Sequence, residues 1–503
     1  MHDQLALLAA GLVNTFEPLN MLMIITGLTI GILAGALPGI TMLNAIVLVL
    51  PFTYLMGIVP SLLLMTSVYC GGVFGGSITG ILFNIPGDPM NVPTTWEGYQ
   101  LNKKGFVSKA LGMAIMCSAI GGFLSALIMT FVSPPFAKVA LSFSSCEYFA
   151  VVFLGLVSVV VIGTKSLGSA LISLFIGMVL ATVGMDDIYG AVRFTFGSRV
   201  METGINFTTV LIGLFAIGEV LDQLSLKNKG EADIARTRPK TSLPGFRDLW
   251  PLRYTMLRGL GIGTVIGAIP GTGATVSSFV SYGVEKQVSK TPEKFGTGCW
   301  EGLAASETSI NASTGGAMIP LLTLGIPGSG ATAVMMGAFL LHGIQPGPLL
   351  FNKSPESVYT IFVGMLICNL IMILAGVVTA KFFSELMRVP ENILCAFIIT
   401  FCFLGAFALR NDMADVWFMA IFGITGFFMR RYGLPIPPMI LGIILGPLTE
   451  KYFMTTMIGA GNDFTIFFRR PISACLMVIS IGLLIMPILR NLGKKEKKKA
   501  VAA

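Results

Sequence analysis

Charged side chains are scarce in this chain. Asp, Glu, Lys and Arg together make up 12% of its 503 residues, about half of the roughly 25% that is usual in soluble domains. A water-soluble globule of this length needs far more charged surface, so that class is excluded. A disordered chain and a nucleic-acid-binding protein are excluded as well, because the hydrophobic fraction is 54% and the mean hydropathy is +0.83.

Residues that carry enzyme chemistry are also few. The chain has 2 histidines, His2 and His342, and 8 scattered cysteines without a C-x-x-C pair, so we expect neither a transition-metal site nor a disulfide scaffold. No Ser/His/Asp constellation and no Walker loop is present in the sequence. We therefore predict that the protein is not an enzyme, hydrolyses no ATP and needs no cofactor.

What the sequence has instead is a series of long apolar runs. They are continuous, whereas the strands of a membrane barrel alternate in polarity, so the runs predict helices. A helix crosses a bilayer core with roughly 20 apolar residues. We predict an all-α polytopic membrane protein with about 10–12 transmembrane helices and additional discontinuous or re-entrant segments.

Basic residues indicate which segments face the cytoplasm, because excess Lys and Arg mark cytoplasmic loops. The net charge is +8, and basic residues gather at 226–258 and at 491–503. We predict a cytoplasmic linker at 226–258 and a cytoplasmic C-terminal tail at 491–503 that can contact anionic membrane lipid. The linker separates a first half, residues 1–225, from a second half, residues 259–490.

Glycine and proline gather in matched places in the two halves. In the first half, Gly-Ala-Leu-Pro-Gly at 35–39 precedes Gly-Gly-Ser at 75–77 and Ile-Pro-Gly at 85–87. In the second half, Gly-Ala-Ile-Pro-Gly at 267–271 precedes Gly-Gly-Ala at 315–317 and Ile-Pro-Gly at 326–328. The offset between the halves is 232 residues at the first motif and 241 at the last. The order predicts two homologous halves, and we favour inverted repeats, whose breaks would meet at the membrane midplane.

These motifs predict helix breaks at 35–44, 71–95, 267–278 and 307–330. A Pro-Gly turn stops a helix because Pro lacks an N–H group and Gly adopts a positive φ. The freed backbone groups cannot face lipid, so they face protein or a water-filled cavity. Half-helix N-termini then favour anions, and C-terminal carbonyls can coordinate Na⁺. Matched breaks of this kind are typical of secondary transporters.

The glycines and the small polar residues at the breaks are the candidate ligands for a substrate or a coupling cation such as Na⁺. The candidates are Gly39, Thr41, Asn44, Ser77, Thr79, Asn84, Gly87, Gly271, Thr272, Gly273, Thr275, Thr308, Ser309, Asn311, Gly328 and Ser329. Glu307 stands apart as an acid inside an apolar segment. It can carry a proton or bind a cation, or it can cap a helix at the membrane interface.

These motifs together resemble the large membrane subunit of tripartite tricarboxylate transporters, the TctA family. The resemblance is carried by residues 35–39, 69–77, 84–87, 95–99, 324–329 and 342–349, and it extends from about residue 20 to residue 490. It implies a multi-pass protein of the bacterial inner membrane. It also implies import of a di- or tricarboxylate with Na⁺ or H⁺, together with a small membrane subunit of about four helices and a periplasmic solute-binding protein that delivers the substrate.

Two positions differ from the pattern of that family. Ile310 precedes a single Asn311 where the family usually has paired asparagines, and Glu97 stands where Asp is frequent. We therefore assign neither citrate by name nor the coupling ion. The resemblance is compatible with a homo-oligomer and with an elevator-type motion. The alternative is a passive anion channel that needs no binding protein, because discontinuous helices also build selectivity filters.

Overall fold

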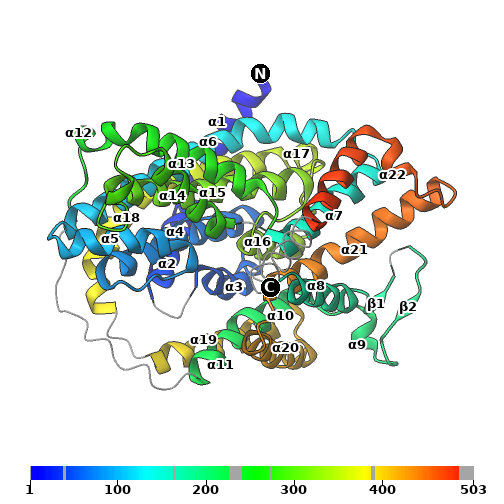
Figure 1. Cartoon of the computed structure of the whole chain (residues 1–503). Helices are drawn as coiled ribbons and strands as arrows, with labels where there is room; N and C mark the ends of the chain where they lie inside the picture. Colours follow the sequence, from blue (N-terminus) through cyan, green and yellow to red (C-terminus); the bar gives the residue numbers. More distant parts are fainter. Residues whose placement is uncertain are drawn as a thin grey trace, which may run out of the picture. The chain divides into compact units, whose positions relative to one another are not determined.

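A computed structural model describes residues 2–37, 41–162, 166–186, 188–225, 241–271, 273–386 and 391–485 (Figure 1). Within these ranges the protein is helical, apart from the short antiparallel pair β1 (Gly184–Met185) and β2 (Val192–Arg193). Five helices are long and apolar enough to cross a membrane, and several shorter apolar helices accompany them. The predicted class, a helical protein of several membrane spans, is confirmed, and the larger number of crossings stays a prediction.

The chain divides into two compact units. Unit 1 consists of residues 1–138 and 211–427, and unit 2 of residues 139–210 and 428–503. Each unit therefore draws helices from both halves of the sequence. Of the predicted basic segments, residues 226–240 of the linker and the whole tail at 491–503 lie outside the described ranges.

The elements of unit 1 begin and end as follows. Its first stretch contains α1 (His2–Thr15), α2 (Pro18–Ala36), α3 (Met42–Thr53), α4 (Ile58–Phe83), η1 (Pro89–Asn91), α5 (Val92–Lys103) and most of α6 (Val107–Ala140). Its second stretch contains η2 (Ile212–Ile217), α11 (Gly218–Ser225), α12 (Phe246–Leu249), η3 (Trp250–Leu252), α13 (Arg253–Ala268), α14 (Gly273–Val288), η4 (Pro292–Lys294), α15 (Trp300–Leu324), α16 (Gly330–Leu341), α17 (Leu350–Lys353), α18 (Pro355–Leu386), α19 (Glu391–Arg410) and most of α20 (Met413–Arg431).

Unit 2 is built around α21 (Ile436–Gly459), against which α7 (Ser145–Ile162) and α8 (Leu167–Ala181) pack. The remaining elements of this unit are α9 (Arg199–Glu202), most of α10 (Phe207–Leu211) and α22 (Ile466–Arg469). Phe149 of α7 contacts Phe467 of α22 with their ring centroids 4.8 Å apart. Aromatic contacts of this kind close the core of unit 2.

In unit 1, α2 packs along α4 with almost no space between the two backbones. Gly27, Gly31 and Gly35 lie on one face of α2, at intervals of four residues. A Cβ atom on these glycines would lie 2.5, 2.4 and 2.3 Å from the carbonyl oxygens of Leu64, Val68 and Gly72, respectively. Only glycine fits such contacts, which are typical of close helix pairs in membranes.

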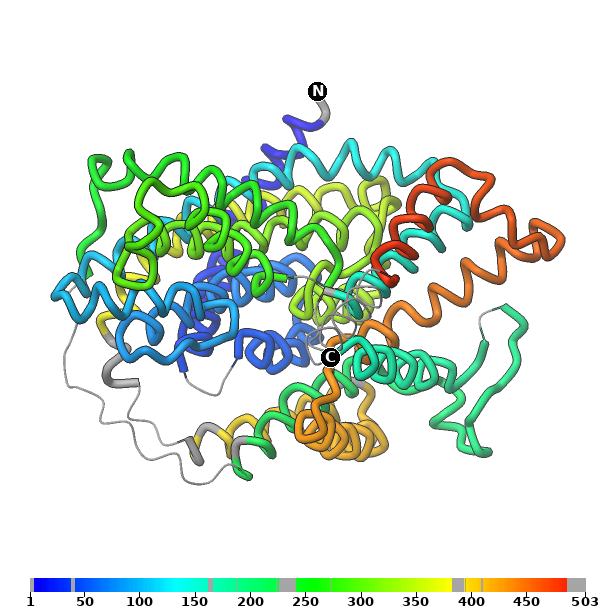
Figure 2. The backbone as a smooth tube through the Cα atoms, viewed as in Figure 1, coloured from blue at the N-terminus to red at the C-terminus, as the bar shows by residue number. Residues whose placement is uncertain are grey.

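The pair formed by α13 and α15 repeats this packing in the second half. A Cβ atom on Gly259, Gly263 and Gly267 of α13 would lie 3.1, 2.4 and 2.5 Å from the carbonyl oxygens of Ala305, Ser309 and Ser313, respectively. The glycines of α13 follow those of α2 by 232 residues, and the carbonyls of α15 follow those of α4 by 241. These are the offsets of the sequence motifs. Figure 2 shows helices of the first half, in blue, beside helices of the second half, in green.

Candidate functional site

One helix break of the first half follows α4. Asn84 ends this helix with φ at 61°, a left-handed conformation that stops the helical hydrogen-bond ladder. Ile-Pro-Gly at 85–87 follows, and Asp88 then caps η1 through Asn91. The Gly87 N–H group donates to the Gly76 carbonyl at 3.3 Å. The break is therefore an ordered turn with internal hydrogen bonds.

The matching break of the second half follows α15 and has the same construction. Gly325 ends the helix with φ at 70°, Ile-Pro-Gly at 326–328 follows, and Ser329 caps α16 through Thr332. These residues lie 241 positions after Asn84, Asp88 and Asn91. The Gly271 N–H group donates to the Gly328 carbonyl at 3.0 Å. In this structure the N–H groups of Gly87 and Gly271 are therefore engaged within the protein.

The breaks bring helix N-termini from both halves together. A Cβ atom on Gly330, the first residue of α16, would lie 3.6 Å from the side chain of Leu43, which is the second residue of α3. A Cβ atom on Gly273, the first residue of α14, would lie 3.7 Å from the Cβ atom of Ser329. Each N-terminus carries a partial positive charge, so their convergence favours an anion.

Glu307 lies in α15 and is fully buried. Its carboxylate accepts hydrogen bonds from the hydroxyl groups of Ser77 on α4 at 2.6 Å, Thr94 on α5 at 2.5 Å and Ser118 on α6 at 2.7 Å. None of the Lys, Arg and His side chains in the described ranges forms an ion pair with it. Burying an uncompensated carboxylate is costly, so this geometry favours a bound proton or a cation.

Further polar side chains support the hydroxyl groups around Glu307. Asn91 donates through Nδ2 to the Ser77 hydroxyl at 2.9 Å and to the Val73 carbonyl at 3.1 Å. The Thr94 hydroxyl lies 3.2 Å from that of Ser306. All of these side chains are buried. The network thus joins both halves of the sequence through α4, α5, α6 and α15.

Asn311 lies one helical turn beyond Glu307 and is also fully buried. Neither its Oδ1 nor its Nδ2 atom has a hydrogen-bond partner among the residues that the structure describes. An unsatisfied buried polar group costs about 1–3 kcal/mol. Residues four apart share a face of a helix, so this free amide and the Glu307 carboxylate can contribute to one binding site.

Other predicted ligands make structural hydrogen bonds instead. The Ser309 hydroxyl donates to the Ser277 carbonyl at 2.9 Å and so holds α14 against α15. Thr41 caps α3 by accepting from the Asn44 N–H group at 3.3 Å, and the Thr79 hydroxyl donates to the Gly76 carbonyl at 3.2 Å.

The remaining predicted ligands differ in burial and in their contacts. Thr308 is buried beside Glu307, whereas Thr275 is exposed in the first turn of α14. The Ser329 hydroxyl lies 3.3 Å from that of Tyr69. Gly39 and Thr272 lie outside the described ranges.

Sequence reasoning missed Ser118, Thr94, Ser306 and Asn91 as members of the site. Ser118 is one of four serines in α6, and only the packing of the fold turns it toward Glu307. Asn91 and Thr94 lie within the predicted break at 71–95, so their polarity inside an apolar stretch was a usable signal.

A buried acid also fixes the N-terminal end of α15. Glu97 of α5 is fully buried, and its carboxylate accepts from the Tyr282 hydroxyl at 2.6 Å. It also accepts from the backbone N–H groups of Gly296, Gly298 and Cys299 at 2.6, 2.8 and 2.7 Å. Four donors satisfy the charge, and they tie α5 to α14 and to the loop that begins α15.

Comparison with known proteins places this chain among membrane transporters. The family model described as "Tripartite tricarboxylate transporter TctA family" matches residues 21–441. An uncharacterized 52.8 kDa protein of Agrobacterium vitis is 34% identical over 498 residues, which cover 99% of each chain. A second uncharacterized protein of the same organism is 35% identical over 234 residues, which cover 46% of this chain and 97% of the relative. No solved structure matches the chain.

Proposed function

Since the chain belongs to the tripartite tricarboxylate transporter TctA family and is its large membrane subunit, we propose that it imports a di- or tricarboxylate by secondary active transport coupled to Na⁺ or H⁺. Tripartite tricarboxylate transport is what the family implies, and an enzymatic role is excluded by it. The observation that carries the finer proposal is the buried Glu307 carboxylate, which three hydroxyl groups surround and no described cation neutralises.

Coupling takes place at Glu307 and Asn311. A proton on the Glu307 carboxyl, or a Na⁺ ion between it and the Asn311 amide oxygen, removes the uncompensated charge. Hydroxyl groups suit both ions, since each can donate to a carboxylate or offer a lone pair to a cation or a protonated carboxyl. Residues Ser77, Thr94 and Ser118 therefore stabilise the site in both its loaded and its empty state.

The substrate carboxylates bind where the N-termini of α3, α14 and α16 converge. The contacts between Gly330 and Leu43 and between Gly273 and Ser329 support this placement. The first-turn N–H groups of a helix have no partner within the helix. The Met42, Asn44 and Thr332 N–H groups donate to side chains of the protein, so the remaining first-turn N–H groups are the ones that donate to the substrate. Partial charges from helix termini, together with the coupling cation, then compensate a substrate that meets no Lys or Arg at the breaks.

The two halves arose by duplication and form an inverted repeat. The glycine contacts of α2 with α4 and of α13 with α15 support the duplication, because they recur at offsets of 232 and 241 residues. The matched caps at Asn84 and Gly325 support it further. In an inverted repeat the two breaks approach the midplane from opposite sides, which is where transporters bind their substrates.

The protein lies in the bacterial inner membrane and works with two partners. A small membrane subunit accompanies it, and a periplasmic solute-binding protein delivers the carboxylate. The basic linker and the C-terminal tail face the cytoplasm, as the positive-inside rule favours. The family supports this assembly, since its transport systems are tripartite.

The test is uptake of labelled di- and tricarboxylates into proteoliposomes that contain the chain and its small subunit. Accumulation should require both the binding protein and an imposed Na⁺ or H⁺ gradient. Asn311→Ala and Ser77→Ala should each lower accumulation, whereas Asn352→Ala, at an exposed position on α17, should leave it unchanged. A downhill leak that needs neither gradient nor binding protein would contradict the proposal and favour a passive pore. Unchanged accumulation in both site variants would contradict the site.

A further inference from the structure

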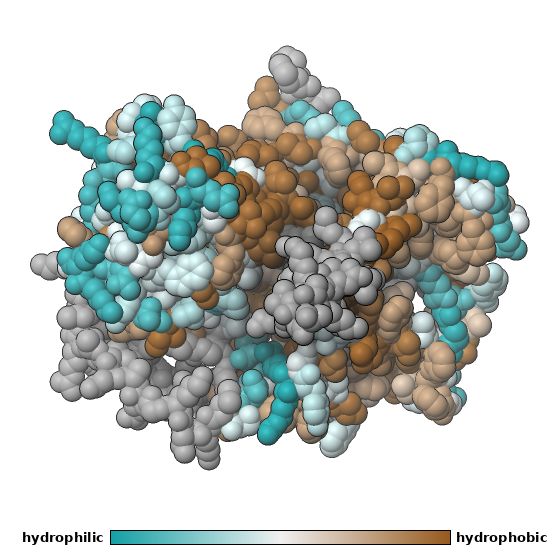
Figure 3. Space-filling view, in the orientation of Figure 1, coloured by the Kyte–Doolittle hydropathy of each residue, from teal (hydrophilic) through white to brown (hydrophobic). Residues whose placement is uncertain are grey.

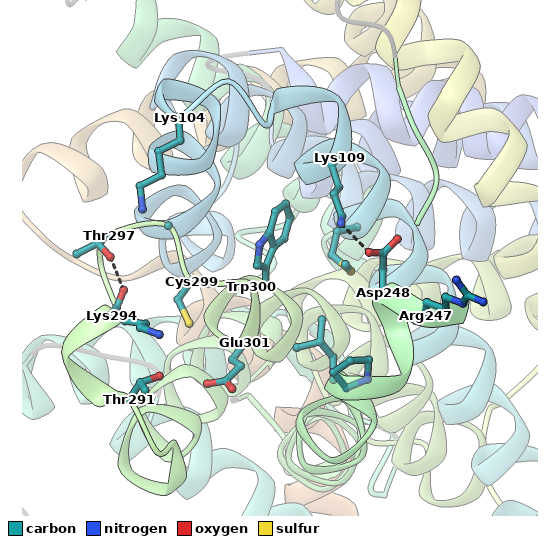
Figure 4. Close-up of a pocket in the computed structure, with 14 residues that line it drawn as sticks. Lys104, Lys109, Arg247, Asp248, Thr291, Lys294, Thr297, Cys299, Trp300 and Glu301 are labelled. Atoms are coloured by element: carbon teal, nitrogen blue, oxygen red, sulfur yellow. Dashed lines mark hydrogen bonds and ion pairs between the residues drawn. The ribbon is translucent and has the colours of Figure 1, made fainter. Parts of the chain in front are cut away.

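A cavity of about 550 Å³ lies at one end of unit 1, away from the helix breaks. Figure 4 shows Trp300 standing between Lys104 and Lys109, with Lys294 and Arg247 farther out on either side. The lining comes from the end of α5, the start of α6, the segment of α12 and η3, and the loop that leads into α15. These segments lie far apart in the sequence, so the cavity is a product of the fold.

The cavity carries a surplus of positive charge. Its lining includes four cations, Lys104, Lys109, Arg247 and Lys294, against the two carboxylates of Asp248 and Glu301. Lys109 pairs with Asp248 at 2.6 Å and holds the pKa of that carboxyl below its usual range. The other three cations form no ion pair with any residue in the described ranges. They are therefore available to an anionic ligand.

The N-terminus of α15 also borders the cavity. Thr297, Gly298, Cys299, Trp300 and Glu301 line the cavity, and α15 begins at Trp300. A helix of 25 residues presents partial positive charge at its N-terminus, which favours phosphate and carboxylate groups. The Glu97 carboxylate already accepts from the N–H groups of Gly298 and Cys299, so the attraction for an anion rests on the lysine and arginine side chains of the cavity.

An exposed apolar face leads away from the cavity along α13. Pro251 and Leu252 line the cavity, and α13 begins directly after them. The outer face of α13 carries Tyr254, Leu257, Gly261 and Val265. Leu257 is 57% exposed and Val265 is 64% exposed, while the opposite face carries the glycines that pack against α15. The outer face of this helix is therefore apolar, and no residue that the structure describes covers it.

Aromatic side chains stand where the basic cavity meets this face. Trp250 is 54% exposed and Phe246 is 73% exposed, and their ring centroids lie 5.1 Å apart. The Arg253 guanidinium lies 4.7 Å from the ring centroid of Trp250. Aromatic and basic residues combine in this way at the headgroup level of a membrane. Figure 3 shows hydrophilic residues over this end of unit 1, beside a hydrophobic area.

We propose that this cavity binds the phosphate of an anionic phospholipid from the cytoplasmic leaflet, with an acyl chain along the outer face of α13. The headgroup phosphate is held by Lys104, Arg247 and Lys294, and Trp300 forms the wall of the cavity between Lys104 and Lys109. Basic pockets between helices on the cytoplasmic side are suited to such headgroups. This site is separate from the breaks and does not depend on the proposed transport, whereas the choice of the cytoplasmic leaflet rests on the proposed cytoplasmic position of the basic linker.

The continuity of the basic cavity with the apolar face favours a lipid over a soluble anion. A free phosphate or carboxylate would use the cations but would gain nothing from Leu257 or Val265. A lipid uses both, since burial of its chain adds a hydrophobic contribution to the charge interaction.

The test is a native mass spectrometry titration of the purified full chain with short-chain phosphatidylglycerol and with the matching phosphatidylcholine. The chain should prefer phosphatidylglycerol. In the triple variant Lys104→Gln, Arg247→Gln and Lys294→Gln, phosphatidylglycerol should bind roughly 100-fold more weakly, since a basic residue near an anionic leaflet contributes about fivefold each. The matched control is Lys103→Gln, Lys286→Gln and Lys290→Gln, which removes equal charge from exposed positions outside the cavity and should bind as the unaltered chain does.

Two further arms separate a lipid from a soluble anion. Leu257→Asn with Val265→Asn should weaken phosphatidylglycerol binding several-fold while leaving the four cations in place. Glycerol phosphate and inorganic phosphate, offered alone, should bind much more weakly than the lipid. Equal binding of the two lipids, or equal loss in the triple variant and its control, would overturn the site. If glycerol phosphate binds as tightly as the lipid and the apolar variants have no effect, the cavity binds a soluble anion and the proposal of a lipid ligand is wrong.

Discussion

The Tyr282 hydroxyl donates to the Glu97 carboxylate at 2.6 Å, and this contact joins residues 185 positions apart in the sequence. Both side chains are buried. The Tyr282 ring also packs edge-on against Phe295, with the centroids 5.4 Å apart. Since Glu97 accepts three backbone N–H groups from 296–299 as well, it sets the point at which α15 begins. The position of Glu307, seven residues farther on, depends on that start.

We predict that Glu97→Gln lowers stability more than Tyr282→Phe does. An amide can accept fewer of the four hydrogen bonds, and its NH₂ group meets N–H donors, so the loss should be about 3 kcal/mol. Removing the Tyr282 hydroxyl should cost about 1–2 kcal/mol, because the remaining donors still satisfy the carboxylate. Thermal unfolding in detergent measures both, with Glu293→Gln as the control at an exposed acid of the same loop. Equal melting of Glu97→Gln and its control would contradict the role of Glu97.

The helix breaks could be predicted from sequence because their signals are local. Pro-Gly dipeptides and the preceding cap act within a few residues, so the turns that follow α4 and α15 could be located without a fold. The predicted breaks at 71–95 and 307–330 were too wide, because α4 stays helical to Phe83 and α15 to Leu324, and the glycines inside these helices serve close packing. The glycine stripes are local as well, since an interval of four residues defines a helix face. The matched positions of Asn84 and Gly325 follow from the same turn.

The environment of Glu307 could not be predicted in the same way. The three hydroxyl groups that donate to it come from α4, α5 and α6, about 190–230 positions earlier in the sequence. No local pattern indicates which serines and threonines of these helices will face Glu307. Ser309 illustrates the reverse case. It was a predicted ligand, but it lies on the face of α15 that meets α14 and donates to a backbone carbonyl there.

A pair of glycines on α13 tests the close helix contact. In Gly263→Ala the new Cβ atom would lie 2.4 Å from the Ser309 carbonyl oxygen, so α13 must move away from α15. We expect a loss of about 1–3 kcal/mol, as for other overpacked positions. Gly261→Ala is the control on the same helix, because no atom lies within 4 Å of its Cβ position. It should be neutral or stabilise by about 0.4–1 kcal/mol. Melting temperatures that fall equally in both variants would refute the contact.

The matched caps of the two breaks differ in the substitutions that they allow. Asn84 and Gly325 both adopt a positive φ, which glycine accepts without strain and asparagine tolerates better than other residues. We expect Asn84→Gly to be neutral within about 0.5 kcal/mol and Gly325→Ala to cost about 1–2 kcal/mol. Gly325→Asn should also destabilise, because any Cβ atom at this position would lie 2.6 Å from the Pro346 carbonyl oxygen. A Gly325→Ala variant as stable as the unaltered chain would show that the turn relaxes and that its conformation is not required.

Glu307 provides the sharpest test of coupling. In Glu307→Gln the amide oxygen can accept from Ser77, Thr94 or Ser118, and a rotated hydroxyl can accept from the new NH₂ group, so the protein should fold. The variant can no longer take up a proton or compensate Na⁺ with a full charge. Losing a charge-assisted interaction of about 1.5–3 kcal/mol should lower gradient-driven accumulation roughly 10- to 100-fold, whereas exchange of labelled for unlabelled substrate should persist.

The control for that variant is Glu356→Gln, which removes an exposed acid from the first turn of α18. Proteoliposomes loaded with unlabelled carboxylate measure exchange, and an imposed Na⁺ or H⁺ gradient measures accumulation in the same preparation. Comparing the two gradients also names the ion. The variant Glu307→Asp gives a second test of the ion, because it shortens the side chain by one methylene group. That change should weaken a Na⁺ site, which needs several ligands at fixed distances, more than it weakens protonation of one carboxyl. If Glu307→Gln accumulates substrate as well as its control does, coupling takes place elsewhere and Glu307 serves only to hold α15 against α4, α5 and α6.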